Sequence, residues 1–469
     1  MSLETVTIHS TNKHNVSFPS LKIPLHGFDL FGAPIQILNH RFFHPPPSSS
    51  TTTNSNFFSK LVEKLKSSLA EALELYPPVQ GTIRNDDEYV ICIAMDDANR
   101  PGTPFTVEIK DTPYIIGYDS EDLSPRTGLI LPPGAPTLAV KVTLFSCGTI
   151  VVASSLHHQV ADLRGFLDFL EVWAQLARDE PIDLTRIPKD WSRTPARFFD
   201  RLNHDNPIIT PPPFTVLPEP PTGPYAYLLA PSKVTRWKFT KASMSQLKAD
   251  FSSSVTNKND DTWISSGDAL ASLISGAITR ARHQGNVERM EGRSALESQQ
   301  EKIAMAADGR ERAPRKNMAK GHYFGNFNNL WSIDISRDDL LSPTPEAGGH
   351  IALAIRKELN IQLSPQNIGN RIAFFEDSKI NKPPGRIAWS ADIILTNWCR
   401  NDLQGSEFDL GWGKPFKATS GANTIFPPGY SLMTQDKESG EITVLITVEN
   451  AGDAGLKSDL LLTQYAELL

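Results

Sequence analysis

The stretch that most constrains the fold is residues 138–178. Two β-like segments, LAVKVTLF and TIVVASSL, are joined by the short turn SCG, and the second segment is almost continuously apolar. A helical pattern follows directly, with apolar residues at Leu163, Phe166, Leu167, Leu170 and Trp173. Strands that lead into an amphipathic helix predict a mixed α/β fold.

The same alternation extends along the rest of the chain. One-sided helical patterns are expected at residues 57–76, where Pro77-Pro78 ends the run, at 265–282 and at 350–363. Ser265 with Asp268 three residues later is typical of a helix cap. Strand-like segments are VTRWKF and, near the end, ITVLITVEN.

Two segments break the pattern and divide the chain. PPPSSSTTTNSN at 45–56 is polar and low in complexity, which predicts an exposed loop. The chain becomes Pro-rich between about 179 and 224, which indicates a semi-rigid crossover. Because 469 residues are about three times the usual domain length, we expect two α/β domains, at 1–200 and 225–469, joined by a linker at 201–224.

Composition excludes several classes of protein. A net charge of -7 argues against a nucleic-acid partner. The three cysteines are far apart and lack CxxC spacing, so neither a disulfide framework nor a thiolate metal site is expected. No secretory signal and no run of about 18 apolar residues is seen. We expect a cytoplasmic protein with no membrane partner and no metal cofactor.

Adjacent histidines end the second strand, in LHHQVADLRGF at 156–166. Asp162 lies four residues after His158, on the connection to the next helix. An HxxxD pattern is weak by itself, because His158 as a core histidine and Asp162 as a residue favoured by the helix dipole would explain it equally. The functional alternative is that a neutral imidazole at this connection acts as a general base.

Four further motifs follow in the second half. They are ADGR at 307–310, HYFGN at 322–326, LTNWCR at 395–400 and FDLGWGKP at 408–415. Together with HxxxD, they make the chain resemble the BAHD family of acyl-CoA-dependent acyltransferases, whose second signature is DFGWG. The chain departs from the family pattern at three places: Leu163 and Arg164 precede Gly165, Leu410 replaces Phe, and Asn397 replaces Ser.

The resemblance implies two chloramphenicol-acetyltransferase-like domains with an active-site tunnel at their interface. It assigns His158 as the base, whereas His157 is expected to pack on the opposite face, because adjacent strand residues alternate. It also implies that Asp162, the second catalytic-motif residue, pairs with an arginine that shapes the loop. Arg400 is the candidate for that arginine.

Other residues take their expected roles from the same resemblance. Thr396 and Trp398 are candidate donors to the oxyanion, with ordinary strand packing as the alternative. The turn formed by Asp409, Gly411, Trp412 and Gly413 is expected to be structural. The basic segment 310–320 would attract coenzyme A phosphates or be a solvated loop. The residues expected to contact coenzyme A are Ser265, Ser266, Asp308, Arg310, Tyr323, Gly325 and Asn326.

The expected reaction is direct transfer of an acyl group from acyl-CoA to a hydroxyl or amine of a small molecule. The sequence contains no evident activated Ser or Cys nucleophile, so we do not expect a covalent acyl-enzyme intermediate. Two alternatives remain open: a carrier-protein-dependent condensation enzyme, because HHQVAD also fits the start of HHxxxD, and a non-catalytic binding protein on the same scaffold. We expect a monomer, and the insertions at 45–56 and 204–224 suggest specialised metabolism.

Overall fold

The structure is a computed structural model of the 469-residue chain. It describes residues 2–14, 22–25, 27–31, 34–46, 54–87, 90–96, 100–128, 130–199, 207–222, 230–255, 262–287, 299–314, 318, 322–382, 385–389, 391–421 and 426–469.

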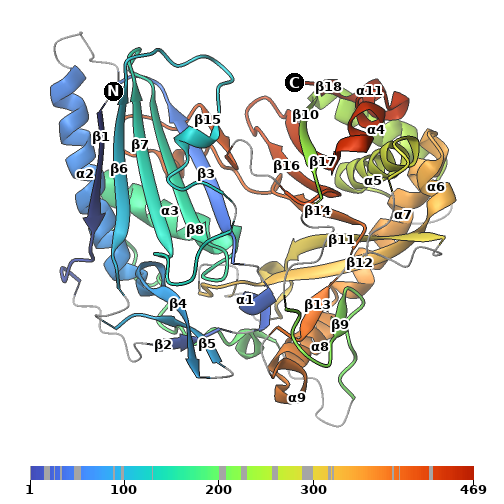
Figure 1. The fold of residues 1–469 in the computed structure, drawn as a ribbon, viewed down its shortest axis with the longest axis horizontal. Helices are drawn as coiled ribbons and strands as arrows, with labels where there is room; N and C mark the ends of the chain where they lie inside the picture. The colour runs from blue at the N-terminus through green and yellow to red at the C-terminus, as the bar shows by residue number, and fades with distance from the viewer. Residues whose placement is uncertain are drawn as a thin grey trace.

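The first half of the chain is built on a six-stranded sheet (Figure 1). Its strands, in spatial order, are β1 (Ser2–Ile8), β6 (Thr103–Lys110), β7 (Leu138–Phe145), β8 (Ile150–His157), β3 (Gln36–Phe43) and β15 (Lys417–Thr419). Strands β6 and β7 are parallel and the other neighbours are antiparallel, so the sheet is mixed. The predicted strands at 138–145 and 149–156 are confirmed to within one residue.

Two helices cover one face of this sheet: α2 (Asn54–Leu75) and α3 (Leu163–Ala177). Alternate residues of β8, among them Val152 and Leu156, pack against them in one hydrophobic core. The helix predicted at 57–76 is confirmed, but it begins three residues earlier, inside the segment predicted as a loop. Residues 47–53 of that loop lie outside the described residues.

The second half contains a seven-stranded mixed sheet with its own core. Its strands, in spatial order, are β12 (Asn328–Ser336), β11 (Gln300–Asp308), β14 (Ile393–Asn397), β16 (Tyr430–Gln435), β17 (Ile442–Glu449), β10 (Ser232–Phe239) and β18 (Glu467–Leu468). The helices of this half are α4 (Lys241–Ser253), α5 (Ser266–Gln284), α6 (Arg337–Leu341), α7 (Pro345–Gln362), α10 (Asp453–Lys457) and α11 (Leu460–Tyr465). The two mixed α/β halves predicted from the sequence are therefore confirmed.

Smaller elements lie below the two sheets in Figure 1. They are the strands β2 (Lys22–Pro24), β4 (Thr82–Asp87), β5 (Val90–Ala94), β9 (Phe214–Val216) and β13 (Ile387–Trp389), and the helices α1 (Gly27–Phe31), α8 (Pro365–Glu376) and α9 (Ser378–Asn381). Strand β9 comes from the segment predicted as a linker and pairs with β13, so part of that segment is ordered against the second half.

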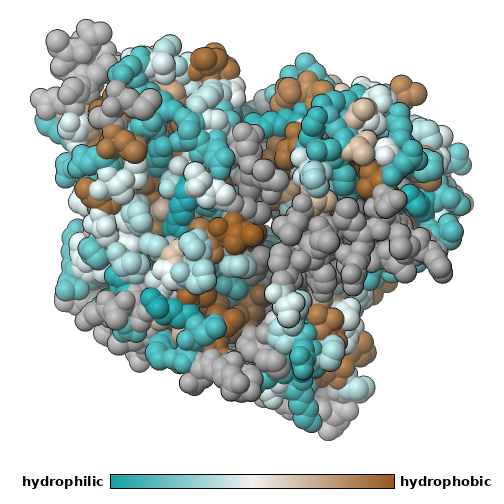
Figure 2. Space-filling model, viewed as in Figure 1, coloured by the Kyte–Doolittle hydropathy of each residue, from teal (hydrophilic) through white to brown (hydrophobic). Residues whose placement is uncertain are grey.

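One segment of the second half returns to the first sheet. Strand β15 pairs with β3, and Leu403, Phe408 and Leu410 belong to the core of the first half. The predicted domain boundary at residue 225 places this segment in the second domain, whereas its apolar side chains are buried in the first. In the space-filling view the two halves are separated by a notch at the top (Figure 2). None of the described helices combines the length and hydropathy needed to span a bilayer.

We expect Phe166→Ala to lower the free energy of unfolding by about 3–5 kcal/mol, because the ring is fully buried between α3 and the sheet. Urea unfolding followed by tryptophan fluorescence measures this change. Gln175→Ala, on a half-exposed position of the same helix, should change it by about 0.5 kcal/mol or less. Equal losses for the two variants would mean that this helix is not anchored through Phe166.

Candidate functional site

The two histidines lie at the point where β8 ends and α3 has not yet begun. The backbone N–H of His157 donates to the Thr137 carbonyl and that of His158 to the Ile35 carbonyl, each at 2.8 Å. The His157 side chain is buried, whereas His158 is partly exposed. These bonds fix the backbone of both histidines. The His158 ring is therefore attached to a rigid backbone without being sealed in the core.

The tautomer of His158 follows from its contact with Asn326. The Oδ1 atom of Asn326 lies 3.1 Å from His158 Nδ1. The Nδ2 group of Asn326 donates to the His158 carbonyl at 2.7 Å and to Asp29 Oδ1 at 3.1 Å. Both partners of Nδ2 can only accept, which orients the amide and makes Oδ1 the acceptor for Nδ1–H of the ring. The neutral ring then carries its lone pair on Nε2.

A buried ion pair holds Asn326 in place. Asp29 Oδ1 accepts from the Asn326 backbone N–H at 2.9 Å and from the Arg193 guanidinium at 2.7 Å. Both charged side chains are buried, and Arg193 also donates to the Val160 carbonyl. Gly325 has a φ of 153°, and a Cβ there would lie 3.0 Å from Arg193 Nη1. No motif identified Asp29 from the sequence, although a lone acid in the apolar run GFDLF was a possible signal.

Asp162 has a different role from His158. It is the N-cap of α3 and accepts from the Gly165 N–H at 3.1 Å, and also from the Phe327 N–H at 2.8 Å. The Arg310 guanidinium binds both of its oxygens, at 2.9 and 3.0 Å. Burial opposes ionisation of Asp162, but the charge and hydrogen bonds of Arg310 outweigh it and lower the pKa of the carboxyl. Asp162 is thus an ionised, fully bonded group that positions the loop.

The predicted pairing of Asp162 with Arg400 is wrong, because Arg310 occupies that place. Arg400 is exposed, and its charge acts on Arg312 instead. The Arg310 guanidinium also contacts Asp308 at 2.9 Å and the Gly325 carbonyl at 2.9 Å, and the residue is 2% exposed. A side chain bonded and buried in this way does not fit the predicted contact with coenzyme A phosphates. Residues 315–317 and 319–320 of the predicted basic segment lie outside the described residues.

Electrostatics favour a neutral His158. Burial is the largest influence and lowers the pKa of its imidazole, although its own carbonyl, the Asp162 charge and Asn326 act in the opposite direction. Burial, with the charges of Arg126 and His158, lowers the pKa of His157 to about 4. At neutral pH both rings are therefore uncharged, and only the His158 ring is partly open to solvent.

The end of β14 approaches this region from the second half. Thr396 Oγ1 accepts a hydrogen bond of 2.9 Å from the Tyr430 hydroxyl, so the Thr396 proton remains available to a further acceptor. The Trp398 ring packs against the core of the first half, although Trp398 directly follows β14 of the second sheet. Trp398 therefore lies where the two halves meet, and Thr396 is two residues before it, on β14.

The predicted cap of α5 is confirmed as a capping box between Ser265 and Asp268. Arg356 donates to both side chains, at 2.7 and 2.8 Å, so the Ser265 hydroxyl is already bonded. A Cβ at Gly267 would lie 3.9 Å from Asn397 Nδ2, which places the first turn of α5 beside the end of β14. Tyr323, another predicted coenzyme A contact, is buried below the Arg310 guanidinium.

The LGWG turn lies against the first half of the chain. Asp409 Oδ1 accepts from the backbone N–H groups of Gly411, Trp412 and Gly413, at 2.7 to 3.1 Å. Gly411 has a φ of 108°, which favours glycine, and the Trp412 ring packs on Phe43 with centroids 4.9 Å apart. Arg178, at the end of α3, donates to the Asp409 carbonyl. The Asp409 carboxylate thus organises the turn by accepting from its backbone N–H groups.

Comparison with known proteins identifies the family of the chain. The model of the transferase family matches residues 6–460. The chain belongs to this family, the BAHD acyltransferases. Hydroxycinnamoyltransferase 2 of Oryza sativa subsp. japonica is 27% identical over 372 residues, which are 75% of this chain and 76% of that protein. A hydroxycinnamoyl-CoA:5-hydroxyanthranilate N-hydroxycinnamoyltransferase of Avena sativa is 24% identical, over 82% of this chain and 83% of that protein.

A solved structure shares the BAHD fold over almost the full length. TRI101 of F. graminearum, complexed with coenzyme A and deoxynivalenol, superposes with a TM-score of 0.72 at 18% identity. The match covers 96% of this chain and all of that one. The likeness shows that the two sheets are arranged as in a BAHD acyltransferase.

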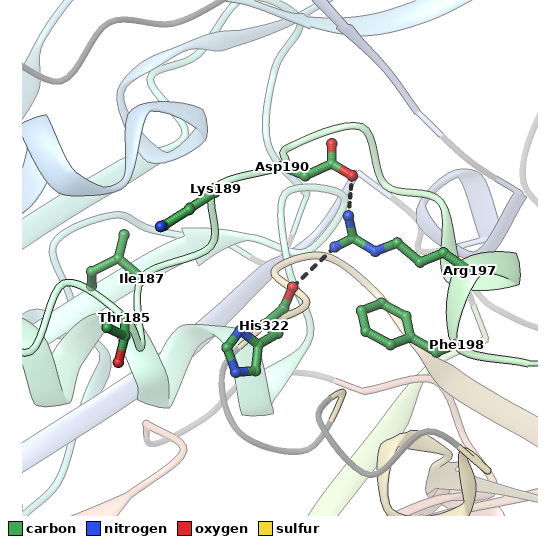
Figure 3. Close-up of a pocket in the computed structure, with 7 residues that line it drawn as sticks. All are labelled: Thr185, Ile187, Lys189, Asp190, Arg197, Phe198 and His322. Carbon is green, nitrogen blue, oxygen red and sulfur yellow. Dashed lines mark hydrogen bonds and ion pairs between the residues drawn. The ribbon is translucent and has the colours of Figure 1, made fainter.

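A separate cavity of about 590 Å³ lies outside the predicted site (Figure 3). It is lined by Thr185, Ile187, Lys189, Asp190, Arg197, Phe198 and His322. Arg197 pairs with Asp190 and donates to the His322 carbonyl at 3.0 Å. His322 directly precedes the YFGN segment, but no residue predicted for the BAHD site lines this cavity. Within the described ranges, no group of three His, Cys, Asp or Glu side chains is positioned to hold a metal ion.

Removing Arg310 should test the buried pair. We expect Arg310→Met to lower the free energy of unfolding by about 3–5 kcal/mol, because it leaves the Asp162 carboxylate buried without its counter-charge. Arg400→Ala is the matched control, because Arg400 is exposed and was first expected to be the partner. It should change the free energy of unfolding by about 0.5 kcal/mol or less. Denaturant unfolding measures both, and the reverse order of effects would contradict the pairing.

Proposed function

We propose that the protein transfers an acyl group from acyl-CoA to a hydroxyl of a small molecule, with His158 as the general base. The observation that carries this proposal is the contact of His158 Nδ1 with Asn326 Oδ1 on a partly exposed ring. That contact leaves the lone pair on Nε2, and the lowered pKa of the imidazole keeps it unprotonated at neutral pH. Family membership supports acyl transfer as the reaction class.

The proposed reaction needs one proton acceptor and no covalent enzyme intermediate. The acceptor hydroxyl gives its proton to His158 Nε2 while its oxygen attacks the thioester carbonyl. A tetrahedral intermediate forms, and its collapse breaks the carbon–sulfur bond. The departing thiolate of coenzyme A takes the proton back from the imidazolium, which restores the neutral ring.

Thr396 is proposed to stabilise the oxyanion of that intermediate. Its oxygen already accepts from the Tyr430 hydroxyl, which directs its own proton toward another acceptor. A donor placed in advance near developing negative charge is worth roughly 3–4 kcal/mol of transition-state stabilisation. Trp398 is proposed as a second donor, because its ring crosses from the second half to the core of the first.

Coenzyme A is proposed to pass along the first turn of α5. Ser266 is the first residue of that helix, and Gly267 adjoins Asn397 at the end of β14. Ser265 is a weaker candidate, since Asp268 and Arg356 already bond its hydroxyl. TRI101 supports the general proposal, because that protein was solved in complex with coenzyme A.

The acceptor is proposed to be a specialised metabolite bearing a hydroxyl group. The relatives include an omega-hydroxypalmitate O-feruloyl transferase of Arabidopsis thaliana and the N-hydroxycinnamoyltransferase of Avena sativa. A hydroxyl is neutral at pH 7 and loses a proton only to a base, which suits the unprotonated His158. Matched alcohols and amines offered with one acyl-CoA distinguish O- from N-acylation. Turnover of free acyl-CoA without any carrier protein separates this reaction from a condensation enzyme.

We expect His158→Ala to lower kcat by about 10² to 10⁴ without a comparable loss of coenzyme A binding. Release of the coenzyme A thiol, with mass spectrometry of the product, measures turnover, and calorimetry measures binding. His157→Gln is the matched control and should retain most of the activity, because that ring is buried and its Nδ1 accepts from the Gln159 N–H. Unchanged turnover in His158→Ala would remove the proposed base.

The pH profile should have an acidic limb at unusually low pH. Burial lowers the pKa of His158, and the neutral ring is the active form, so activity persists below the ordinary histidine value of about 6.5. We expect kcat/KM to be constant around neutrality and to fall only as the pH drops through the lowered pKa. A midpoint above about 6.5 would contradict a desolvated neutral base.

A further inference from the structure

One half-buried arginine is distinguished, within the described part of the chain, by a guanidinium without a bonding partner. Arg126 lies in the connection between β6 and β7, and both of its terminal nitrogens are buried without a hydrogen-bond partner among the described residues. Buried arginines elsewhere have a partner for their guanidinium: Arg193 binds Asp29, and Arg371 donates to Asn329 at 3.1 Å. An isolated buried guanidinium is costly, so its retention calls for a compensating anion.

The charge of Arg126 persists despite that cost. Burial alone lowers the pKa of its guanidinium to about 10, which still leaves the group protonated at neutral pH. A guanidinium presents a planar fork of donors that matches the two oxygens of a carboxylate. The missing partner is therefore expected to be a carboxylate.

The loop that carries Arg126 is fastened beside His158. Ile130 bridges Ile35, whose carbonyl accepts the His158 N–H at 2.8 Å. The Gln36 side chain donates to the Gly128 carbonyl in the same loop. These contacts place the segment around Arg126 at the end of the sheet where β8 gives way to the two histidines.

The loop that carries Arg126 lies on the side of the sheet away from its helices. Gln36 and His157 are register partners, and Gln36 bonds Ser155, so these side chains share one face. The opposite face, with Ile37 and Leu156, packs against α2 and α3. The Gln36 side chain bonds the Gly128 carbonyl, so this loop lies over the helix-free face, and the Arg126 charge acts on His157 there. In Figure 1 this face is crossed by the connection between β6 and β7.

We infer that Arg126 is a specificity-determining residue that binds a carboxylate of the substrate at the end of the sheet where β8 leads into His158. The inference rests on the proposed acyl transfer for the meaning of that site. The carboxylate belongs either to the acceptor or to the far end of the acyl chain. Ile130, 65% exposed in the same loop, favours a carboxylate attached to an apolar body.

A stability measurement separates this role from a structural one. We expect Arg126→Met to leave the melting temperature of the ligand-free protein unchanged or raised, because it replaces an unpaired buried charge by an apolar chain of similar length. An arginine that holds the fold together would give a lowered melting temperature in the same variant. Differential scanning calorimetry at pH 7.5 measures it, and a clear decrease would overturn the inference.

Binding of matched acid and neutral probes tests the ligand class. For the acceptor, para-hydroxybenzoate is compared with its methyl ester; for the acyl chain, succinyl-CoA is compared with butyryl-CoA. We expect the wild type to prefer the acid in one of these pairs, and Arg126→Met to weaken that acid about 30-fold, the factor for losing roughly 2 kcal/mol from a buried charge pair. Arg126→Lys should keep part of the preference, because it retains the charge but not the fork.

Lys233→Ala is the control for a simple change of net charge. Lys233 lies on β10 in the second half and its side chain is 58% exposed, so its removal should leave the acid preference unchanged. A wild type that binds neither acid more tightly than its neutral partner would overturn the inference. Titration calorimetry needs no turnover, so an acid preference that depends on Arg126 would stand even if acyl transfer failed. Turnover without any acid preference would retain the proposed function and remove this site.

Discussion

The buried pair of Asp162 and Arg310 is the interaction on which the arrangement of the site depends. Asp162 caps α3 in the first half, and Arg310 follows β11 of the second sheet. Each charge is costly to bury alone, so the two halves are most stable in the register that brings them together. In that register Arg310 also binds the Gly325 carbonyl, which sets Asn326 beside His158.

The protonation state of His158 is a consequence of this register. Nearby charges are paired, Asp162 with Arg310 and Asp29 with Arg193, so they largely cancel at the ring. Desolvation then dominates and keeps the imidazole neutral, while Asn326 selects the nitrogen that carries the proton. Arg126 differs from these pairs because its partner is absent from the described residues, which is why we assign that partner to the substrate.

The parts predicted most accurately from the sequence were governed by neighbours in the chain. Helix α3, the hairpin of β7 and β8 and the capping box at Ser265 follow from periodicity and from residues three or four positions apart. The partner of Asp162 was mispredicted as Arg400, because Arg310 is 148 residues away and no local pattern links it to Asp162. Strand β15 was assigned to the wrong half for a similar reason, since its pairing with β3 leaves no local pattern.

By itself the sequence determined two mixed α/β halves, the family resemblance and the position of His158 at a strand-to-helix connection. Only the tertiary structure decided which arginine neutralises Asp162, that Asn326 and Asp29 set the His158 tautomer, and that both terminal nitrogens of Arg126 are buried without a partner among the described residues. The physical reason is that periodicity and capping act over a few residues. The energy of a buried charge, in contrast, depends on every group that the folded chain brings within a few ångströms of it.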